Sequence, residues 1–325
     1  MALPQNLPQN LQVGSETGIR LPAIASPLFI ISHPPLTLAQ CKAGVIGAFP
    51  ALNARPVEQL DDWLSELTEE LANHNAANPE AKAAPFAVNQ IVHQSNSRLM
   101  KDLELTVKHK VPIVITSLGA VPEVNDAVHS YGGIVLHDIT NNRHANSAIR
   151  KGADGLIAIA NGAGGHAGKL SPFALINEIR EWFDGPLLLG GAIATGGGVL
   201  AAQAMGADMA YIGSPFIATT EARAEDPYKQ TIVEAVADDI VYSNLFTGIH
   251  GNYLRQSIEA AGMDPKNLPE ADPSKMDFGG DKAAKAWKDI WGAGQGVGAV
   301  KAVDSTQVLV DRLVAEYEAA KSALL

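Results

Sequence analysis

The chain has 325 residues, of which 46% are hydrophobic and 18% are charged, and it carries a formal net charge of −11 at pH 7. This composition is typical of a globular protein with a large core, and the negative charge argues against nucleic acid, because phosphate binding needs a basic surface. The apolar runs are strand-sized rather than the roughly 20 residues of a membrane helix, and no signal-peptide pattern opens the chain, so we expect a cytoplasmic protein without a membrane partner.

Eight short apolar runs, each ending in small or polar residues, alternate with amphipathic stretches between residues 20 and 225. Such runs are typical of buried strands in a parallel sheet whose two faces are both covered by helices. The predicted strands are residues 21–26, 44–49, 86–89, 112–117, 133–138, 155–160, 186–190 and 207–213. The predicted helices are residues 57–72, 97–108, 123–131, 141–151, 172–183 and 198–205.

This α/β alternation leaves two architectures, an open doubly wound sheet and a closed (β/α)8 barrel. An open sheet of the nucleotide-binding kind has a glycine-rich turn after its first strand, whereas the turn at residues 25–28 contains no glycine. Glycines instead follow the seventh and eighth strands, where barrel enzymes commonly bind phosphate. We therefore predict that residues 1–225 form a (β/α)8 TIM barrel.

After residue 225 the alternation stops. Residues 226–300 are predicted to form an insertion of helices and loops that covers the barrel mouth, and residues 301–325 a C-terminal helix that packs on the barrel. That helix is expected over 305–323, with Asp304 or Ser305 at its start. A GxGxxA pattern at 292–299 follows the helix-like run 282–291 rather than a strand, so it predicts a loop over the barrel mouth and not a dinucleotide site.

Two glycine-rich turns lie one strand–helix unit apart, at residues 189–198 and 206–214. Residues without bulky side chains let backbone N–H groups approach a phosphate, and a following helix N-terminus adds favourable charge. The sequence therefore predicts a phosphate site, with two ordinary glycine-capped turns as the alternative. Its expected members are Gly190, Gly191, Ala192, Gly213 and Ser214.

A histidine surrounded by small residues follows the sixth predicted strand, within residues 161–168. Its imidazole would titrate near neutral pH, which suits a general base. We expect His166 to lie in a flexible, uncrowded loop at the catalytic end of the barrel. The hypothesis is that His166 is catalytic, and a structural histidine is the alternative.

Polar residues also end three other predicted strands, namely Asn89, Ser117 and the pair His137-Asp138. Barrel side chains at these ends face the ligand, although buried hydrogen bonds would explain them equally well. His93 follows Asn89 closely enough to reach the mouth as well. The single cysteine, and histidines that show no ligand spacing with carboxylates, predict no metal site.

These motifs together resemble the nitronate monooxygenase family, formerly called 2-nitropropane dioxygenases, whose members are FMN-containing TIM-barrel enzymes. The resemblance covers about residues 20–225 and returns at 291–298. It is carried by the turn at 25–28, the strand at 86–89, the run Ala163-Gly164-Gly165-His166, and the glycines at 191 and 213.

The resemblance implies roles for these residues. His166 would be the active-site base, the strand ends would contact the flavin, and the glycine turns would hold the phosphate of FMN. The residues expected to contact the cofactor are Ala25, Ser26, Asn89, Ser117, His137, Gly164, Gly165, Gly190, Gly191, Ala192, Gly213, Ser214 and Gln295.

Two departures from the family pattern bear on these roles. The phosphate turn reads Gly191-Ala192 where the family usually has two glycines, a change that keeps the backbone N–H. Some relatives carry a lysine after the histidine of the fifth strand, whereas this chain has Asp138. The positive charge that would stabilise a reduced flavin is therefore missing or supplied by His137.

The implied activity is the oxidation of alkyl nitronates, with nitroalkanes as further substrates, by O₂ to carbonyl compounds and nitrite. The flavin would carry out the electron chemistry while the protein positions the substrate. Relatives on the same scaffold include NAD(P)H-dependent quinone, flavin and enoyl reductases, so an NAD(P)H oxidoreductase is the alternative, and a flavin-free phosphate-binding barrel is a second. The expected partners are a small nitronate and O₂, and a homodimer is left open.

Overall fold

Eight strands, each parallel to its neighbours, form one sheet in the computed structural model, which describes residues 7–271 and 289–324. Their order in the sheet is β1-β9-β8-β6-β5-β4-β3-β2. An isolated parallel bridge between Ile24 and Ile46 joins the two ends of this order, so the sheet closes into a barrel. The strands are β1 (Ala23–Ala25), β2 (Gly47–Pro50), β3 (Phe86–Ile91), β4 (Ile113–Ser117), β5 (Ile134–Ile139), β6 (Gly155–Ile159), β8 (Leu187–Gly190) and β9 (Met209–Ile212).

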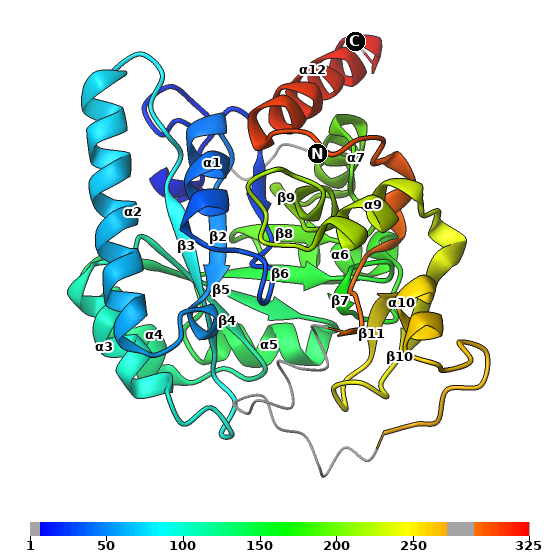
Figure 1. Ribbon diagram of the computed structural model, residues 1–325. Coiled ribbons are helices and arrows are strands. Elements are labelled where there is room, and N and C mark those ends of the chain that lie inside the picture. The colour runs from blue at the N-terminus through cyan, green and yellow to red at the C-terminus, as the bar shows by residue number, and fades with distance from the viewer. Residues whose placement is uncertain (1–6, 272–288, 325) are drawn as a thin grey trace.

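Helices surround this barrel (Figure 1). They are α1 (Pro34–Ala43), α2 (Glu58–Ala77), α3 (Leu99–Lys108), α4 (Pro122–His129), α5 (Asn142–Arg150), α6 (Pro172–Arg180), α7 (Gly196–Met205) and α8 (Ser214–Ile217). The predicted (β/α)8 barrel is confirmed, and each of the predicted helical stretches contains a helix. The sequence analysis did not predict α1, because six of its ten residues are buried and no polar face marks it.

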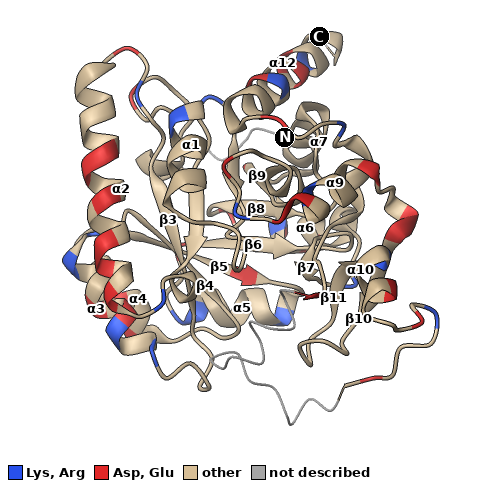
Figure 2. Ribbon diagram, in the orientation of Figure 1, with Lys and Arg blue, Asp and Glu red and all other residues tan. Residues whose placement is uncertain are grey.

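Strand periodicity separates the apolar residues into two layers. Side chains alternate between the two faces of a strand, so Ile113, Ile115 and Leu136 point into the barrel and fill it. Val114 and Val135 point outward and pack against the helices. Charged residues lie mostly on the outer helices and loops, whereas the barrel strands carry few (Figure 2). This arrangement leaves the carboxyl ends of the strands as the place where inward-pointing polar residues meet.

The chain after β9 contains strands that the sequence analysis did not predict. It forms α9 (Asp226–Glu234), an antiparallel hairpin of β10 (Ile240–Ser243) and β11 (Gly251–Leu254), and α10 (Arg255–Ala260). The prediction of helices and loops alone for 226–300 was wrong in this respect, because strands of four residues without apolar alternation give no detectable pattern. A short segment of the β6–α6 connection, β7 (Gly165–His166), pairs with β11. Residues 282–288 of the predicted helix-like run lie outside the described residues.

The last helix, α12 (Thr306–Leu324), packs on α1 and α7. Its start agrees with the prediction, since Ser305 Oγ accepts a hydrogen bond of 3.3 Å from the Val308 N–H. Close approach of α12 requires the glycine at the first position of α7. A β-carbon on Gly196 would overlap the backbone of Leu313 and Tyr317.

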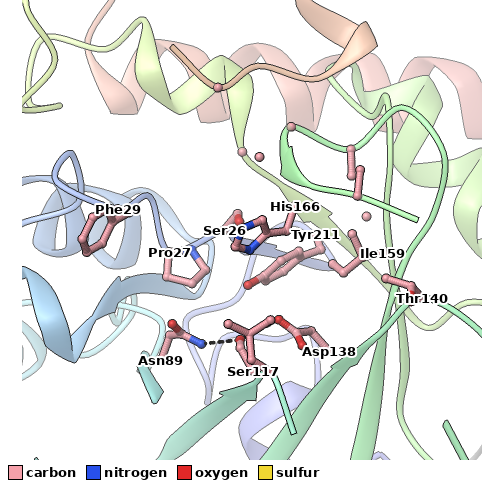
Figure 3. A pocket seen from close by; sticks show the side chains of 18 of the residues that line it. Ser26, Pro27, Phe29, Asn89, Ser117, Asp138, Thr140, Ile159, His166 and Tyr211 are labelled. Carbon is pink, nitrogen blue, oxygen red and sulfur yellow. Dashed lines mark hydrogen bonds between the residues drawn. The ribbon is translucent and has the colours of Figure 1, made fainter. Parts of the chain in front are cut away.

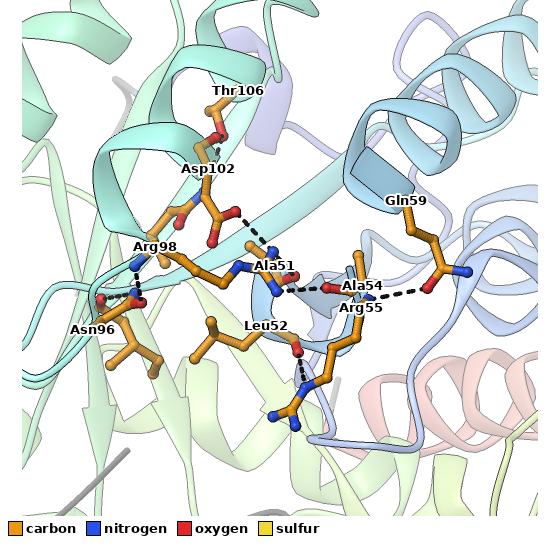
Figure 4. Close-up of polar contacts among 11 residues, drawn as sticks. Ala51, Leu52, Ala54, Arg55, Gln59, Asn96, Arg98, Asp102 and Thr106 are labelled. Carbon is orange, nitrogen blue, oxygen red and sulfur yellow. Dashed lines mark hydrogen bonds and ion pairs between the residues drawn. The ribbon is translucent and has the colours of Figure 1, made fainter. Parts of the chain in front are cut away.

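A buried ion pair fixes the turn after β2 at the barrel mouth (Figure 4). Arg98, just before α3, donates to Asp102 Oδ1 at 2.8 Å and to the Ala54 carbonyl at 2.6 Å. The neighbouring Asn53 in turn donates to the carbonyls of Leu28 and Ser32 at 3.0 and 2.8 Å. Two loops of the mouth are therefore held to one helix by side-chain hydrogen bonds.

We expect Arg98→Met to lower the free energy of unfolding by about 3 kcal/mol. Removing one partner of a buried pair typically costs about 3–5 kcal/mol, and the lower end applies because the Arg98 side chain stays 23% exposed while that of Asp102 is fully buried. Urea unfolding would measure the change. Lys101→Met, at an exposed position of the same helix, is the matched control. Equal effects of both substitutions would contradict a structural role for the pair.

Candidate active site

A cavity of about 640 Å³ opens at the carboxyl ends of the barrel strands. Segments far apart in the sequence meet there because parallel strands end at the same edge of a barrel. Most of the residues predicted to form the site line it, namely Ser26, Asn89, Ser117, His137, Gly164, Gly165, His166, Gly190, Gly191, Ala192, Gly213 and Ser214.

Two of the expected cofactor contacts do not line the cavity. Ala25 is fully buried in β1, and its side chain packs in the outer apolar layer. Gln295 has an exposed side chain, and its backbone N–H donates to the Gly162 carbonyl at 2.9 Å. The neighbouring Gly294 and Gly296 border the cavity instead. The GxGxxA segment thus contributes backbone to the cavity wall.

The two glycine-rich turns lie side by side, because Gly190 of β8 pairs with Tyr211 of β9. Gly191 has a φ of +148°, and a β-carbon there would lie 2.8 Å from the Asn161 carbonyl oxygen. Gly213 has an ordinary φ of −111°. A β-carbon at Gly213 would point toward Ser26, 3.5 Å from its Cβ, in ordinary van der Waals contact. These turns form a cradle of backbone at the cavity wall, and a side chain added at Gly213 would lie beside Ser26 and Leu28, which line the cavity.

Two details differ from the expected phosphate site. The Ala192 N–H donates to the Gly162 carbonyl at 3.2 Å, so this donor is already used within the protein. Two backbone N–H groups in the first turn of α7 are also used within the protein. Gly196 N–H donates to Glu316 Oε2 at 2.8 Å, and Gly198 N–H donates to Thr195 Oγ1 at 3.1 Å. With a carboxylate at its start, the N-terminus of α7 does not supply the favourable charge that the sequence analysis expected.

Ser214 adds a hydroxyl to the glycine cradle. Its Oγ accepts a hydrogen bond of 2.8 Å from the Gly294 N–H. Because a serine hydroxyl also carries one proton to donate, Ser214 can still serve a ligand in the cavity. The cradle of Gly190, Gly191, Gly213 and Ser214 therefore fits a compact anionic group such as a phosphate.

Three polar residues form a hydrogen-bonded chain across the ends of β3, β4 and β5 (Figure 3). Asn89 Nδ2 donates to Ser117 Oγ at 2.7 Å, and Ser117 Oγ donates to Asp138 Oδ2 at 2.5 Å. All three occupy inward-pointing positions of their strands, in phase with Ile115 and Leu136. Burial raises the pKa of Asp138 to about 6, although hydrogen bonds from Ser117 and the Leu118 N–H act in the opposite direction.

His137 borders the cavity from the other face of β5. It follows the inward-pointing Leu136, and its Nδ1 lies 2.6 Å from the hydroxyl of Thr116, which also points outward. Burial, followed by the positive charges of His144 and Lys151, lowers the pKa of His137 to about 4. The imidazole is therefore neutral at pH 7 and does not replace the lysine that some relatives carry. Asp138, which the sequence analysis placed at the strand end beside His137 but did not expect to contact the cofactor, is the residue that points into the mouth.

Tyr211 is a cavity residue that the sequence analysis did not single out. It lies at the inward-pointing end of β9, in phase with Met209. Burial raises its pKa, and so does the nearby negative charge of Asp138, whereas a hydrogen bond with the Ser26 side chain acts in the opposite direction. The alternation of Met209 and Tyr211 was the available signal, because it places an aromatic ring at the mouth.

His166 lies across the cavity from the Asn89–Ser117–Asp138 chain, beyond the ring of Tyr211 (Figure 3). The residue is part of β7 and pairs with Gly251 of β11, so the expectation of a flexible, uncrowded loop was wrong. Its Nε2 lies 3.2 Å from the Thr247 hydroxyl. Burial lowers the pKa of His166 to about 4, not near neutrality as expected. The imidazole is therefore neutral at pH 7 and able to accept a proton.

The insertion after β9 holds the backbone around His166. Asn252 Nδ2 donates to the Ala163 carbonyl at 2.6 Å, and the Ala167 N–H donates to the His250 carbonyl at 3.1 Å. The Tyr242 hydroxyl donates to the Ala167 carbonyl at 3.2 Å. These contacts come from residues about 80 positions away in the chain, which is why sequence reasoning placed His166 in a free loop.

Tyr228 of α9 is a further cavity residue that the sequence analysis missed. Its ring stacks on Trp291 with centroids 4.9 Å apart, and its hydroxyl donates to the Gly292 carbonyl at 2.5 Å. Tyr228 thereby joins α9 to the glycine segment that borders the cavity. No local pattern distinguished this tyrosine from a core residue.

Within residues 7–271 and 289–324, no group of three or more His, Cys, Asp or Glu side chains is arranged to hold a metal ion. No helix in the same part of the chain combines the length and the apolar character needed to cross a membrane.

Comparison with known proteins gives one family match over most of the chain. The family model described as nitronate monooxygenase matches residues 18–316. A nitronate monooxygenase from Paraburkholderia phytofirmans is 28% identical, over 83% of this chain and 82% of its own length. A probable nitronate monooxygenase from Staphylococcus saprophyticus is 24% identical, over 71% of this chain and 74% of its own length.

Solved structures share the fold. A nitroalkane oxidase from Streptomyces ansochromogenes superimposes with a TM-score of 0.78 at 23% identity, covering 94% of this chain and 98% of its own. FabK from Thermotoga maritima superimposes with a TM-score of 0.76 at 22% identity, covering 95% of this chain and 96% of its own.

Proposed function

Because the chain belongs to the nitronate monooxygenase family, we propose that it is an FMN-dependent enzyme that oxidises alkyl nitronates, and nitroalkanes after deprotonation, with O₂ to carbonyl compounds and nitrite. One observation carries the proposal. A neutral, buried imidazole and a side-chain-free glycine cradle lie on the wall of one cavity.

The cofactor would be held by backbone and small side chains. Gly191, Gly213 and Ser214 would bind the phosphate. The Ala192 N–H already donates within the protein, and neither Ala25 nor Gln295 lines the cavity, so we assign these three no phosphate contact. Ser26, Asn89 and Ser117 would contact the ring system at the strand ends. When bound, FMN would supply the electron acceptor for the nitronate.

His166 would act on the substrate. A nitroalkane must lose its α-proton before oxidation, and a neutral imidazole in a desolvated cavity can accept that proton. A nitronate has already lost it, so His166 would then only position the anion. The inward-pointing polar group near the end of β5 is the carboxyl of Asp138, whereas His137 lies on the other face of the strand.

We expect the purified protein to be yellow and to release FMN, rather than FAD, on denaturation. The glycine cradle suits one terminal phosphate, and within residues 289–324 no strand borders the GxGxxA segment as it would in a motif that binds an adenylate half. Chromatography of the released cofactor measures this directly. Release of FAD, or a colourless protein without flavin, would contradict the cofactor assignment.

Anaerobic mixing tests the reaction itself. Addition of a nitronate should bleach the flavin absorbance, and addition of NADH or NADPH should not. Rapid bleaching by a reduced pyridine nucleotide, with none by a nitronate, would replace the proposed activity by that of an NAD(P)H oxidoreductase.

A further inference from the structure

The carboxyl of Asp138 points into the cavity without a cationic partner among the described residues. Of those that line the cavity, Asp138 carries the one carboxylate and Lys151 the one lysine or arginine side chain. The Lys151 Nζ donates to the Ala120 carbonyl at 2.8 Å, and its charge acts on His137, which faces outward from β5. Asp138 faces inward from the same strand, so its charge acts on whatever the barrel mouth holds.

Two hydrogen-bond donors hold this carboxyl in place (Figure 3). The Asn89 amide donates to the Ile115 carbonyl at 3.1 Å and to Ser117 Oγ at 2.7 Å. Because the Ser117 hydroxyl accepts from this amide, its own proton is directed to Asp138 Oδ2 at 2.5 Å. The Leu118 N–H donates to the same carboxyl. Both donors favour the ionised form of Asp138.

The backbone that supplies the second donor is strained. Leu118 borders the cavity with a φ of +64°, a conformation that leucine rarely adopts. Strained residues persist where the surrounding structure holds them, and they cluster at functional sites. Burial opposes the two donors and raises the pKa of Asp138 to about 6. At pH 7 the ionised form therefore predominates only about tenfold, so a modest change in charge nearby is enough to protonate it.

Reduction adds negative charge to a flavin held in this cavity. The ring system takes up two electrons and one proton, so it gains one negative charge unless a second proton follows. Ser117, to which Asp138 is bonded, is one of the strand-end residues that we propose contact the ring system. Two like charges in a desolvated site repel each other, and protonation of one of them removes the repulsion.

We propose that Asp138 opposes the gain of negative charge on the bound flavin and takes up a proton from solvent when the flavin is reduced. The ionised carboxylate then lowers the reduction potential of the flavin. This inference rests on the proposed binding of FMN at the strand ends, but it does not depend on which compound donates the electrons.

Potentiometric titration of the flavin-loaded protein with dithionite and a reference dye tests the charge effect. Asp138→Asn keeps the size of the side chain and an oxygen that can accept from Ser117, but it carries no charge. At pH 8 the variant should favour the reduced flavin about tenfold over wild type, a rise of about 30 mV for a two-electron couple. At pH 5, where the wild-type carboxyl is mostly protonated, the two potentials should agree.

Asp184→Asn is the matched control, because it removes an exposed carboxylate that precedes β8, at the opposite end of the barrel. Its flavin should have the wild-type potential at both pH values. Equal potentials of wild type and Asp138→Asn at pH 8 would overturn the proposal.

Infrared difference spectra between oxidised and reduced protein test the proton uptake directly. At pH 6.5, between the two protonation states, reduction of wild type should produce the carbonyl stretch of a protonated carboxyl, and Asp138→Asn should lack this band. Ser117→Ala removes one donor from the carboxylate, so the uptake should move to higher pH. A wild-type spectrum without the band, or a band that persists in Asp138→Asn, would contradict proton uptake at Asp138.

Other titratable or charged groups line the cavity around Asp138, from β3–α3, β5, α5, β7, β9 and α9, namely His93, His137, His144, Lys151, His166, Tyr211 and Tyr228. Two of the histidines, His137 and His166, have pKa values lowered to about 4, and the pKa values of both tyrosines are raised. These four groups stay neutral between pH 5 and 8. The other three are the same in wild type and Asp138→Asn, so their contributions cancel in the comparison.

The outcomes also separate this inference from the proposed function. A purified protein that binds no flavin would end the cofactor assignment and this inference together. A flavin that dithionite reduces but a nitronate does not would end the proposed activity alone. The potentials of wild type and Asp138→Asn would still decide the role of Asp138.

Discussion

His166→Asn is expected to lower the rate with a neutral nitroalkane by about 10²–10⁴-fold, the range typical of a general base, and to leave most of the activity with the corresponding nitronate. Asparagine keeps a polar side chain of similar size but cannot take up a proton at neutral pH. The fold should persist, because β7 is held through its backbone by β11 and by Asn252. Steady-state kinetics with both forms of one substrate measure the difference.

The pH profile sharpens this prediction. Burial lowers the pKa of His166 to about 4, so the basic form is present above that pH and is lost as the pH falls through it. The wild-type rate with neutral nitroalkane should therefore decrease when the pH is lowered through about 4, rather than through about 6.5. The rate of His166→Asn should not show this decrease. Other titratable groups border the same cavity, namely Asp138, with its pKa raised to about 6, His137, with its pKa lowered to about 4, and the phenols of Tyr211 and Tyr228, whose pKa values are raised. His166→Asn therefore separates the contribution of His166 from that of His137.

His93→Asn is the matched control, because His93 also lines the cavity and contacts Ser95 through Nδ1. It should retain activity with both substrates. Equal losses on nitroalkane and nitronate in His166→Asn would point to positioning rather than proton transfer. No loss with either substrate would make His166 structural and His93 the next candidate.

Gly213→Val is expected to weaken FMN binding by about 10²-fold while leaving the fold intact. The backbone at Gly213 has a φ of −111°, outside the left-handed region that favours glycine, and the β-carbon would have room beside Ser26. The branched side chain would then occupy the cradle in which we place the phosphate. The loss of one or two hydrogen bonds to a charged group accounts for the magnitude. Dialysis followed by the ratio of flavin to protein absorbance measures retention.

Gly191→Val should also lose FMN, but its interpretation is less direct. Its φ of +148° disfavours any side chain, and the β-carbon would meet the Asn161 carbonyl oxygen at 2.8 Å, so the fold would be strained as well. Gly14→Val is the control for both, because a β-carbon at Gly14 meets no atom within 4 Å. Full flavin retention in Gly213→Val would mean that the phosphate lies elsewhere.

The barrel and the location of its mouth were determined by local sequence patterns. Apolar runs of strand length, alternating with amphipathic helices, predicted the eight strands of the barrel. The glycine turns after β8 and β9, and the polar ends of β3, β4 and β5, followed from the same periodicity. Such features depend on residues within about ten positions of one another, so the sequence displays them directly.

The identity of the inward-pointing residue after β5 depended on the strand register within the barrel. Sequence analysis expected His137 to contact the cofactor, and the structure places Asp138 in the mouth and His137 on the outer face. A shift of one residue exchanges the two faces of a strand. The apolar run 133–138 correctly predicted a strand, but it did not determine whether His137 or Asp138 faces the ligand.

The surroundings of His166 were decided by tertiary structure alone. The hairpin of β10 and β11, about 80 residues later, pairs with β7 and supplies Asn252 and Thr247. It also removes water from the imidazole, which lowers the pKa of His166. In the same way, Glu316 from the last helix accepts a hydrogen bond from the first residue of α7, the helix N-terminus that the sequence analysis expected to add favourable charge to the phosphate site. Desolvation and long-range hydrogen bonds depend on atoms that only the folded chain brings together, and no local spacing encodes them.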